Sequence, residues 1–297
     1  MSLPNFFIIG AQKCGTDALY DALRQHPEIY MSPEKEPSYF IMDGGLPDYR
    51  IPSVGYLRRL VPDREDYLRL FKGAGNHKAV GEASAIYLSS YFPERTAARI
   101  RDMLPDARLL ALVRQPADRA YSSYHFYRAR GLEPLGDFQS ALSDEPRRIA
   151  EKECPDIRHR TNGCYYSNLK PYYDLFPSDR IKVFLQEDWA SEPQVVLREI
   201  FRFLGVREDV QCVAKRLNVT TLYRNGMLRK YCVSPNRFQQ RLKHFIPRGV
   251  DMRLDAWNRI PPPPFCKNLR RELTEGFRDE ITCLQGLIGR DLSHWLE

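Results

Sequence analysis

The sequence lacks an uninterrupted apolar run of about 18 residues, the length that a membrane-spanning helix needs. It also lacks a positively charged region ahead of its first short apolar run, so no secretory signal peptide is predicted. We therefore expect a cytoplasmic protein without a transmembrane segment. A luminal catalytic domain separated from its membrane anchor would show the same features, and that alternative stays open.

Cysteine and histidine patterns that mark metal sites or disulfide frameworks are missing as well. The seven cysteines are an odd number, none belongs to a CxxC pair, and no histidines cluster beside them. This pattern argues against a disulfide-rich scaffold and against a zinc site. We predict a protein that uses no metal.

The charge balance favours an acidic ligand. The formal net charge is +7 and the isoelectric point is about 9.0. The basic residues are dispersed among 38 acidic ones, and no helix-turn-helix, zinc-finger or RNP pattern occurs. We predict no nucleic-acid partner, because a polyanionic cofactor explains the charge at least as well.

Short apolar runs alternate with helical spacing along the first two thirds of the chain. Strands separated by helices need crossover connections, which are typical of parallel sheets. The fold class predicted is α/β, a P-loop-like three-layer fold with a central, mainly parallel sheet flanked by helices. The predicted strands are 6–9, 79–82, 108–113 and 181–185.

Other segments read differently. Pro27, Pro33 and Pro37 make 28–40 a loop or an edge segment laid across the strand ends. Strand signals vanish after Glu192, and helical spacing returns at 195–204 and 267–287, so a helical C-terminal segment is expected. The organisation predicted is a single domain over 1–297, with its core at about 5–205 and a helical and loop cover at about 206–297.

The stretch from Asn5 to Arg24 reads as a strand, a glycine-containing loop and a helix entered at Thr16. Unpaired N–H groups at a helix N-terminus attract anions, so this geometry suits a phosphate. The loop differs from the GxxxxGK[ST] pattern of nucleotide triphosphatases, because Lys13 precedes Gly15. A glycine-rich turn without a ligand is the plain alternative.

The run QKCGTDAL resembles the 5′-phosphosulfate loop of sulfotransferases that use 3′-phosphoadenosine 5′-phosphosulfate (PAPS), particularly the heparan sulfate N- and O-sulfotransferases and related bacterial enzymes. The resemblance covers residues 5 to 205 in ordered motifs. It implies that the cofactor is held by Lys13, Cys14, Gly15, Thr16, Asp17 and Ala18.

A second motif follows the strand at 108–113. Arg114 stands at the strand end and Ser122 follows eight residues later on a helix, so both can face one phosphate. The run LVRQPADRAYSSY resembles the 3′-phosphate segment of the same family, with an arginine at the strand end and a serine eight residues on. A helix cap or a surface ion pair is the alternative for Arg114.

The segment SPEKEPSYF resembles the one that carries the catalytic base in heparan sulfate O-sulfotransferases, and the matching residue is Glu36. A carboxylate there could take a proton from the acceptor. A solvated loop carboxylate is the plain alternative. His26 and His125 are rival bases, and either could serve in packing or capping instead.

The remaining site predictions rest on weaker likenesses. Glu82, in GEASAIYL, matches a family segment in which a lysine follows the glutamate, but Ala83 stands here, so Lys35 could supply the charge. Lys35, Glu82 and His125 are therefore predicted at the substrate. Segments like the family's GxYxxxL run and its basic-glycine loop add Tyr166, Arg224, Asn225 and Gly226 to the cofactor site.

These motifs together predict an enzyme, a PAPS-dependent sulfotransferase. Its predicted partners are PAPS, the product 3′-phosphoadenosine 5′-phosphate (PAP) and an acceptor hydroxyl or amine on a glycan, a lipid or a natural product. Two alternatives remain: a P-loop nucleotide kinase, which needs Mg²⁺ and a lysine next to Ser or Thr, and a non-catalytic adenine-nucleotide-binding protein.

Overall fold

The computed structural model describes residues 3–42, 49–50, 60–214, 221–225, 228, 253–254 and 256–297. Its centre is a five-stranded sheet of order β2-β3-β1-β4-β5, in which every neighbouring pair is parallel. This confirms the predicted α/β class. The strands are β1 (Phe6–Gly10), β2 (Ile29–Met31), β3 (Ala79–Ala83), β4 (Arg108–Val113) and β5 (Ile181–Leu185).

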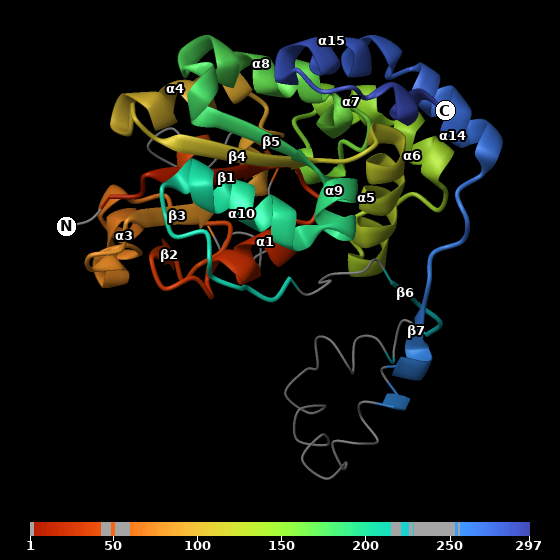
Figure 1. Ribbon diagram of the computed structural model, residues 1–297. Helices are drawn as coiled ribbons and strands as arrows, with labels where there is room; N and C mark the ends of the chain where they lie inside the picture. Colours follow the sequence, from red (N-terminus) through yellow and green to blue (C-terminus); the bar gives the residue numbers. More distant parts are fainter. Residues whose placement is uncertain are drawn as a thin grey trace.

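Helices cover both faces of the sheet, so the molecule has three layers. Figure 1 shows α4, α8 and α15 above the sheet and α1 and α10 below it. The helices are α1 (Thr16–Leu23), α3 (Arg64–Arg69), α4 (Pro93–Met103), α5 (Pro116–Arg130), α6 (Phe138–Ser143), α7 (Glu145–Ala150), α8 (Tyr165–Leu175), α9 (Gln186–Ser191), α10 (Pro193–Leu204), α14 (Lys267–Glu275) and α15 (Arg278–Ile288).

The middle strands are apolar because both of their faces are covered. All five residues of β1 are buried, as are the last five of β4. A strand buried on both faces reads as a continuous apolar run, which is why these two could be predicted from the sequence. The edge strand β2 has only three residues, within the segment predicted as a loop or an edge.

The order of the strands creates a crevice at one edge of the sheet. From β1 the chain builds β2 and β3 on one side, then crosses to the other side of β1 to build β4 and β5. The loops after β1 and β4 therefore leave neighbouring strands at the same edge, where open α/β sheets bind their ligands. The two predicted phosphate motifs occupy these two loops.

The C-terminal part differs from its prediction in two ways. The helical spacing at 267–287 belongs to two helices, α14 and α15, which are separated at Gly276 and Phe277. Phe277 is fully buried and its ring packs against Gly163, at the point where the chain leaves α14 and enters α15. Strands also return after Glu192, as the antiparallel two-residue pair β6 (Leu222–Tyr223) and β7 (Arg259–Ile260), too short to show a periodic pattern.

No helix among the described residues combines the length and the apolar composition that crossing a bilayer requires.

Candidate active site

The loop between β1 and α1 has the shape of an anion cradle. Gly15 caps α1 with φ 101°, a left-handed conformation that only glycine adopts without strain, and no side chain caps this end of the helix. An added Cβ at Gly15 would also reach Trp189 at 3.5 Å. Lys13 itself has φ 68°. The first backbone N–H groups of α1 therefore face the crevice without a side-chain competitor.

Lys13 is a half-buried cation at the mouth of this cradle. Its Nζ lies 3.7 Å from the centre of the Phe126 ring. Burial first, and then the nearby charges of Arg130 and Arg114, lower the pKa of Lys13 to about 8. Within the described part of the chain, no carboxylate forms an ion pair with Lys13. A bound anion would supply the missing counter-charge.

Phe126 separates two cations. The Arg130 guanidinium lies 3.4 Å from the same ring centre as Lys13 Nζ. Two groups that both lie this close to one ring centre must occupy opposite faces, because on one face they would overlap. Ser122, Phe126 and Arg130 are spaced by four residues and share one face of α5. Sequence analysis missed Phe126 and Arg130, although this spacing from Ser122 was a usable signal.

Arg114 follows β4 directly and is held by the start of α5. The side chain of Gln115 caps this helix by accepting a hydrogen bond from the Asp118 N–H at 2.7 Å. The same side chain donates to Thr274 Oγ1 at 2.9 Å and to the Trp295 carbonyl at 3.2 Å. The turn that carries Arg114 is therefore anchored to the C-terminal elements.

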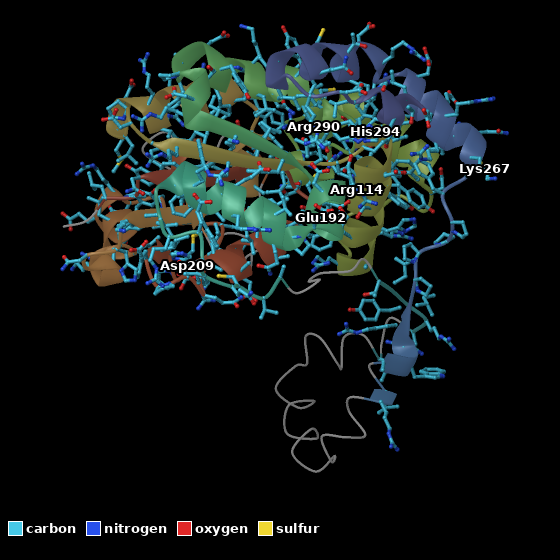
Figure 2. All side chains as sticks on the ribbon, in the orientation of Figure 1. Arg114, Glu192, Asp209, Lys267, Arg290 and His294 are labelled. Carbon is cyan, nitrogen blue, oxygen red and sulfur yellow. The ribbon has the colours of Figure 1, made fainter. Side chains whose placement is uncertain are left out.

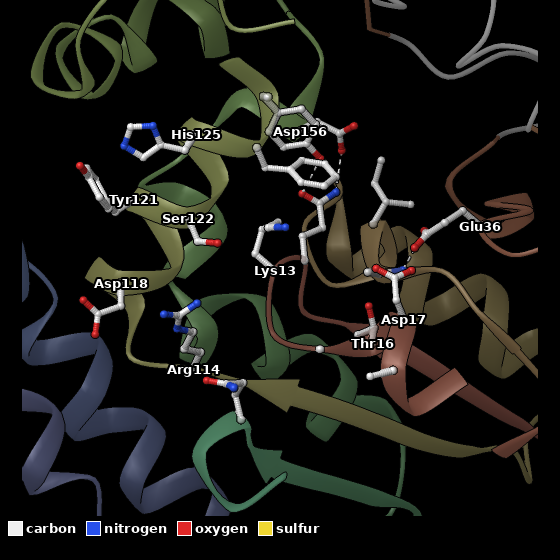
Figure 3. Close-up of a pocket in the computed structure, with 18 of the residues that line it drawn as sticks. Lys13, Thr16, Asp17, Glu36, Arg114, Asp118, Tyr121, Ser122, His125 and Asp156 are labelled. Carbon is white, nitrogen blue, oxygen red and sulfur yellow. Dashed lines mark hydrogen bonds between the residues drawn. The ribbon is translucent and has the colours of Figure 1, made fainter. Parts of the chain in front are cut away.

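A cavity of about 870 Å³ brings the two motifs together. In Figure 3 the side chains of Lys13, Arg114 and Ser122 converge on its centre, and Glu36 lies on the opposite side beside Asp17. The predicted residues that line the cavity are Lys13, Gly15, Thr16, Asp17, Ala18, Lys35, Glu36, Arg114, Ser122 and His125.

Glu36 is held firmly on its side of the cavity. Its Oε1 accepts from Lys35 Nζ at 3.0 Å, and its Oε2 accepts from the Ala85 N–H at 3.0 Å. Its own N–H donates to the Ala83 carbonyl at 2.9 Å, and its φ is 61°. This left-handed backbone at a non-glycine residue is unusual, and such conformations cluster at functional sites.

The two histidines proposed as rival bases have different surroundings. His26 packs on Phe201, its Nε2 contacts the Arg207 carbonyl and its Nδ1 accepts from Glu28, which is a structural environment. His125 lines the cavity, and burial lowers its pKa to about 4, so the ring is neutral. Neither ring nitrogen of His125 has a partner among the described residues.

Several predicted site residues do not line the cavity. Cys14 is fully buried beneath the loop, where burial raises the pKa of its thiol. Glu82 was expected at a strand end, but β3 continues to Ala83, which leaves Glu82 inside the strand with no exposed surface. Tyr166, Arg224 and Asn225 are not among the residues that line the cavity, and Gly226 lies outside the described residues.

A polar contact that the sequence did not signal crosses the cavity wall. Gln12 Nε2 donates to Asp156 Oδ1 at 2.6 Å, although 144 residues separate the two along the chain. Both residues line the cavity, as do Asp118, Tyr121 and Trp189. A pair so distant in sequence has no periodicity that could have revealed it.

A buried charge cluster supports α5 from behind. Both side-chain amino groups of Arg148 donate to Glu133, at 2.6 and 2.8 Å, and His159 Nε2 contacts the same carboxylate at 2.8 Å. Burial opposes ionisation of Glu133, but the hydrogen bonds from His159 and Arg148 lower its pKa to about 2. This cluster fixes the chain just after α5 relative to α7.

The C-terminal segment packs beside the end of β5. Figure 2 shows Arg290 and His294 on the same side of the molecule as Arg114. Arg290 forms an ion pair with Asp188 at 2.9 Å, and His294 Nε2 contacts Glu187 at 3.0 Å. Among the described residues, no group of three or more His, Cys, Asp or Glu could hold a metal ion.

Comparisons with known proteins identify a family and a solved structure with a similar fold. Residues 3–254 match the family model described as "Sulfotransferase domain". The crystal structure of a sulfotransferase from Alicyclobacillus acidocaldarius superposes with a TM-score of 0.79 and 32% sequence identity, covering 100% of both chains.

Curated relatives match over shorter spans. Carbohydrate sulfotransferase 15 of Homo sapiens is 28% identical over 257 residues, which covers 69% of this chain and 44% of the relative. The bifunctional heparan sulfate N-deacetylase/N-sulfotransferase 3 of Homo sapiens is 29% identical over 211 residues, covering 69% of this chain and 22% of the relative. The chain thus spans less than half the length of these two relatives.

Proposed function

The chain belongs to the sulfotransferase family of enzymes, and from that premise we propose that it moves a sulfuryl group from PAPS to an acceptor hydroxyl or amine. The observation that carries this proposal is the convergence of Lys13, Arg114 and Ser122 on one cavity. The donor has anionic groups at its 5′ and 3′ positions. The cavity offers one cationic loop for each of them, at neighbouring strand ends.

The donor fits the charges of the site. Lys13 and the N–H groups at the start of α1 would hold the 5′-phosphosulfate, because the half-buried ammonium forms no ion pair with a carboxylate in the described part of the chain. Arg114 and Ser122 would hold the 3′-phosphate. For Tyr166, Arg224, Asn225 and Gly226 no observation adds support, and their cofactor contacts stay predictions.

The donor would supply the sulfuryl group and a phosphate leaving group. Glu36 would take the proton from the acceptor oxygen or nitrogen as that atom forms its bond to sulfur. The bond from sulfur to the phosphate bridging oxygen breaks, and that oxygen keeps the electron pair. Lys13 would neutralise the charge that develops there. Positioning and electrostatics supply most of the rate, as in phosphoryl transfer.

A carbohydrate is the acceptor that we propose first. The names of two relatives refer to carbohydrates and to heparan sulfate. The cavity lining includes the polar side chains of Lys35, Asp156 and Gln12 beside apolar ones such as Leu60 and Ile86, and the polar groups could hydrogen-bond the hydroxyls of a sugar. A lipid or a natural product is the alternative class. The cytoplasmic location and a mechanism without metal remain parts of the proposal.

Transfer of labelled sulfate tests the proposal directly. Wild-type protein is incubated with ³⁵S-PAPS and with N-desulfated heparin, chondroitin, 4-nitrophenol or a long-chain alcohol, and label in each acceptor is counted. We expect Lys13→Ala to abolish transfer while the circular dichroism spectrum stays native. Arg101→Ala, at an exposed ion pair with Asp102, is the matched control and keeps full activity. Full activity in Lys13→Ala would refute the assignment.

Binding of PAP and AMP tests the second motif. PAP carries the 3′-phosphate and AMP does not, so wild-type protein should prefer PAP. Arg114→Ala removes a charge-assisted contact and should weaken PAP binding by about 2 kcal/mol while barely changing AMP binding. Calorimetry that finds equal losses for both nucleotides would place Arg114 elsewhere.

The same assays separate the two alternatives. A P-loop kinase needs Mg²⁺ and a lysine next to the Ser or Thr after the second glycine, whereas Gly15 is followed by Thr16 with no lysine between them. Phosphate transfer from ATP would support that reading. A non-catalytic nucleotide-binding protein would bind PAP without turnover, and Glu36→Gln would change nothing.

A further inference from the structure

Asp17, Lys35 and Glu36 form a chain of two ion pairs on the cavity wall. Lys35 Nζ lies 2.6 Å from Asp17 Oδ1 and 3.0 Å from Glu36 Oε1. The Lys35 side chain is 20% exposed, whereas those of Asp17 and Glu36 are 40% and 28% exposed. The ammonium is thus the most deeply placed of the three charges, between two carboxylates that face the cavity.

The two carboxylates are anchored to different parts of the site. Asp17 is the second residue of α1 and follows the loop that carries Lys13. Glu36 is fixed to the end of β3 and the turn after it by its hydrogen bonds with Ala83 and Ala85. Lys35 therefore bridges Asp17 at the start of α1, which follows the Lys13 loop, and Glu36, the proposed base.

A proton on Glu36 changes the charge balance of this chain. When Glu36 accepts a proton from the acceptor, its carboxylate becomes neutral and no longer balances the Lys35 ammonium. A mostly buried ammonium without a counter-ion is costly. Asp17 is already in contact with Lys35, so the ammonium keeps one ion pair after the transfer.

This inference rests on the proposed function. We propose that Asp17 is a positioning residue, the second counter-ion of Lys35, which lets Glu36 take up the acceptor's proton without leaving the ammonium unpaired. Asp17 touches neither reacting atom in this role and acts through Lys35. Its side chain would thereby do a task separate from the backbone cradle of α1.

Three titratable groups near Asp17, Lys35 and Glu36 are neutral at pH 7, whereas the Lys13 ammonium, which interacts with Asp17, is charged. Glu82 on β3 faces Glu36, and burial raises the pKa of Glu82 to about 8. Tyr127 on α5 also interacts electrostatically with Glu36, and burial raises the pKa of the Tyr127 hydroxyl. Tyr20 on α1 lies near Lys35, and burial raises the pKa of its hydroxyl as well.

Lys35 itself stays charged. Burial lowers the pKa of Lys35, but Glu36 and Asp17 outweigh burial and raise it overall. The Lys35 ammonium is thus paired with both carboxylates.

The test compares Asp17→Asn with the wild-type protein in sulfate release from ³⁵S-PAPS to water and in transfer to N-desulfated heparin. Water needs a base as any acceptor does, so its reaction is independent of acceptor identity. We expect kcat to fall about tenfold, the size expected for one partly screened charge contact. The acidic limb of the kcat profile should move to lower pH by up to about one unit, because Lys35 then holds Glu36 ionised more strongly.

Matched variants separate this role from damage to the helix. Asp21→Asn, one turn further along α1 and outside the cavity, should keep wild-type kcat. Asp17→Glu should recover most of the lost rate, because it restores the carboxylate. PAP affinity of Asp17→Asn, measured by calorimetry, should stay within about twofold of wild type.

A double substitution gives the decisive result. In a Lys35→Met background, Asp17 no longer has the Lys35 ammonium to balance, so Asp17→Asn should cause a much smaller further loss of kcat than in the wild-type background. An equal loss in both backgrounds, an unchanged pH profile, or a loss explained by PAP affinity alone would overturn the inference. Wild-type protein that releases no sulfate to water and labels no acceptor would instead refute the proposed function.

Discussion

The pKa of Lys13 makes PAP binding sensitive to alkaline pH. Burial and the charges of Arg130 and Arg114 lower this pKa to about 8 in the protein without ligand. Contact with a phosphate favours the ammonium and raises the pKa in the complex. Binding therefore takes up a proton when Lys13 is partly deprotonated. The phosphate groups of PAP are fully ionised above about pH 7.5, since their second pKa is about 6, and do not titrate in this window.

The size of the effect follows from proton linkage. With a pKa of about 8 before binding and one near 10.5 afterwards, PAP affinity should fall about tenfold between pH 7 and pH 9, or about 1.4 kcal/mol. At pH 8, half of the Lys13 population is neutral, so each PAP bound should take up about half a proton.

Calorimetry at several pH values, in buffers of different ionisation enthalpy, measures both quantities. Lys13→Arg is the informative control, because a guanidinium stays protonated throughout and should abolish the pH dependence. Affinity that stays flat from pH 7 to pH 9 in the wild-type protein would refute the reasoning, as would an identical slope in Lys13→Arg.

Three further predictions concern the scaffold and are checked by urea unfolding. Glu133→Gln removes one of the two carboxylates that pair with the buried Arg148, while Asp144 stays, and should lower the free energy of unfolding by about 2–3 kcal/mol at pH 7, a difference that shrinks as pH falls from about 4.5 toward 2; a loss below 1 kcal/mol would contradict this. Glu82→Gln should stabilise the protein at pH 7 by up to about 3 kcal/mol, because the native carboxyl keeps its proton until about pH 8 whereas the unfolded one loses it near pH 4.5; equal stability at pH 5 and 7.5 in the wild-type protein would argue against it. Gly81→Ala places a Cβ against the ring of Phe6 and should cost about 1–3 kcal/mol, with wild-type stability as the contrary result.

The parts of the site that adjoin the ends of apolar strands were predictable from the sequence. Lys13 and Arg114 follow β1 and β4, which read as uninterrupted apolar runs because both faces are buried. Neighbouring parallel strands bring such loops together without further information. These strand ends, together with the resemblance of both loops to the phosphate motifs of sulfotransferases, were enough to predict that Lys13 and Arg114 hold one cofactor.

Other features depend on tertiary packing and left no signal in the sequence. Glu82 was expected at a strand end, but the length of β3 is set by its pairing with β1. Because Ile8 pairs with Ala83, β3 continues one residue past Glu82. The contact between Gln12 and Asp156 joins distant segments. The place of Phe126 could be predicted only in part. Its spacing from Ser122 puts it on the same face of α5, but its position between two cations depends on where Lys13 lies.

The three hydrogen bonds of the Gln115 side chain couple the C-terminal segment to the crevice. One amide joins the first turn of α5, beside Arg114, to Thr274 and to the carbonyl of Trp295. We expect a ligand that holds this turn in place to slow local opening of the C-terminal helices as well. Amide exchange of α14 and α15 would then report occupancy of the crevice more than 150 residues away along the chain, even for a ligand that is never turned over.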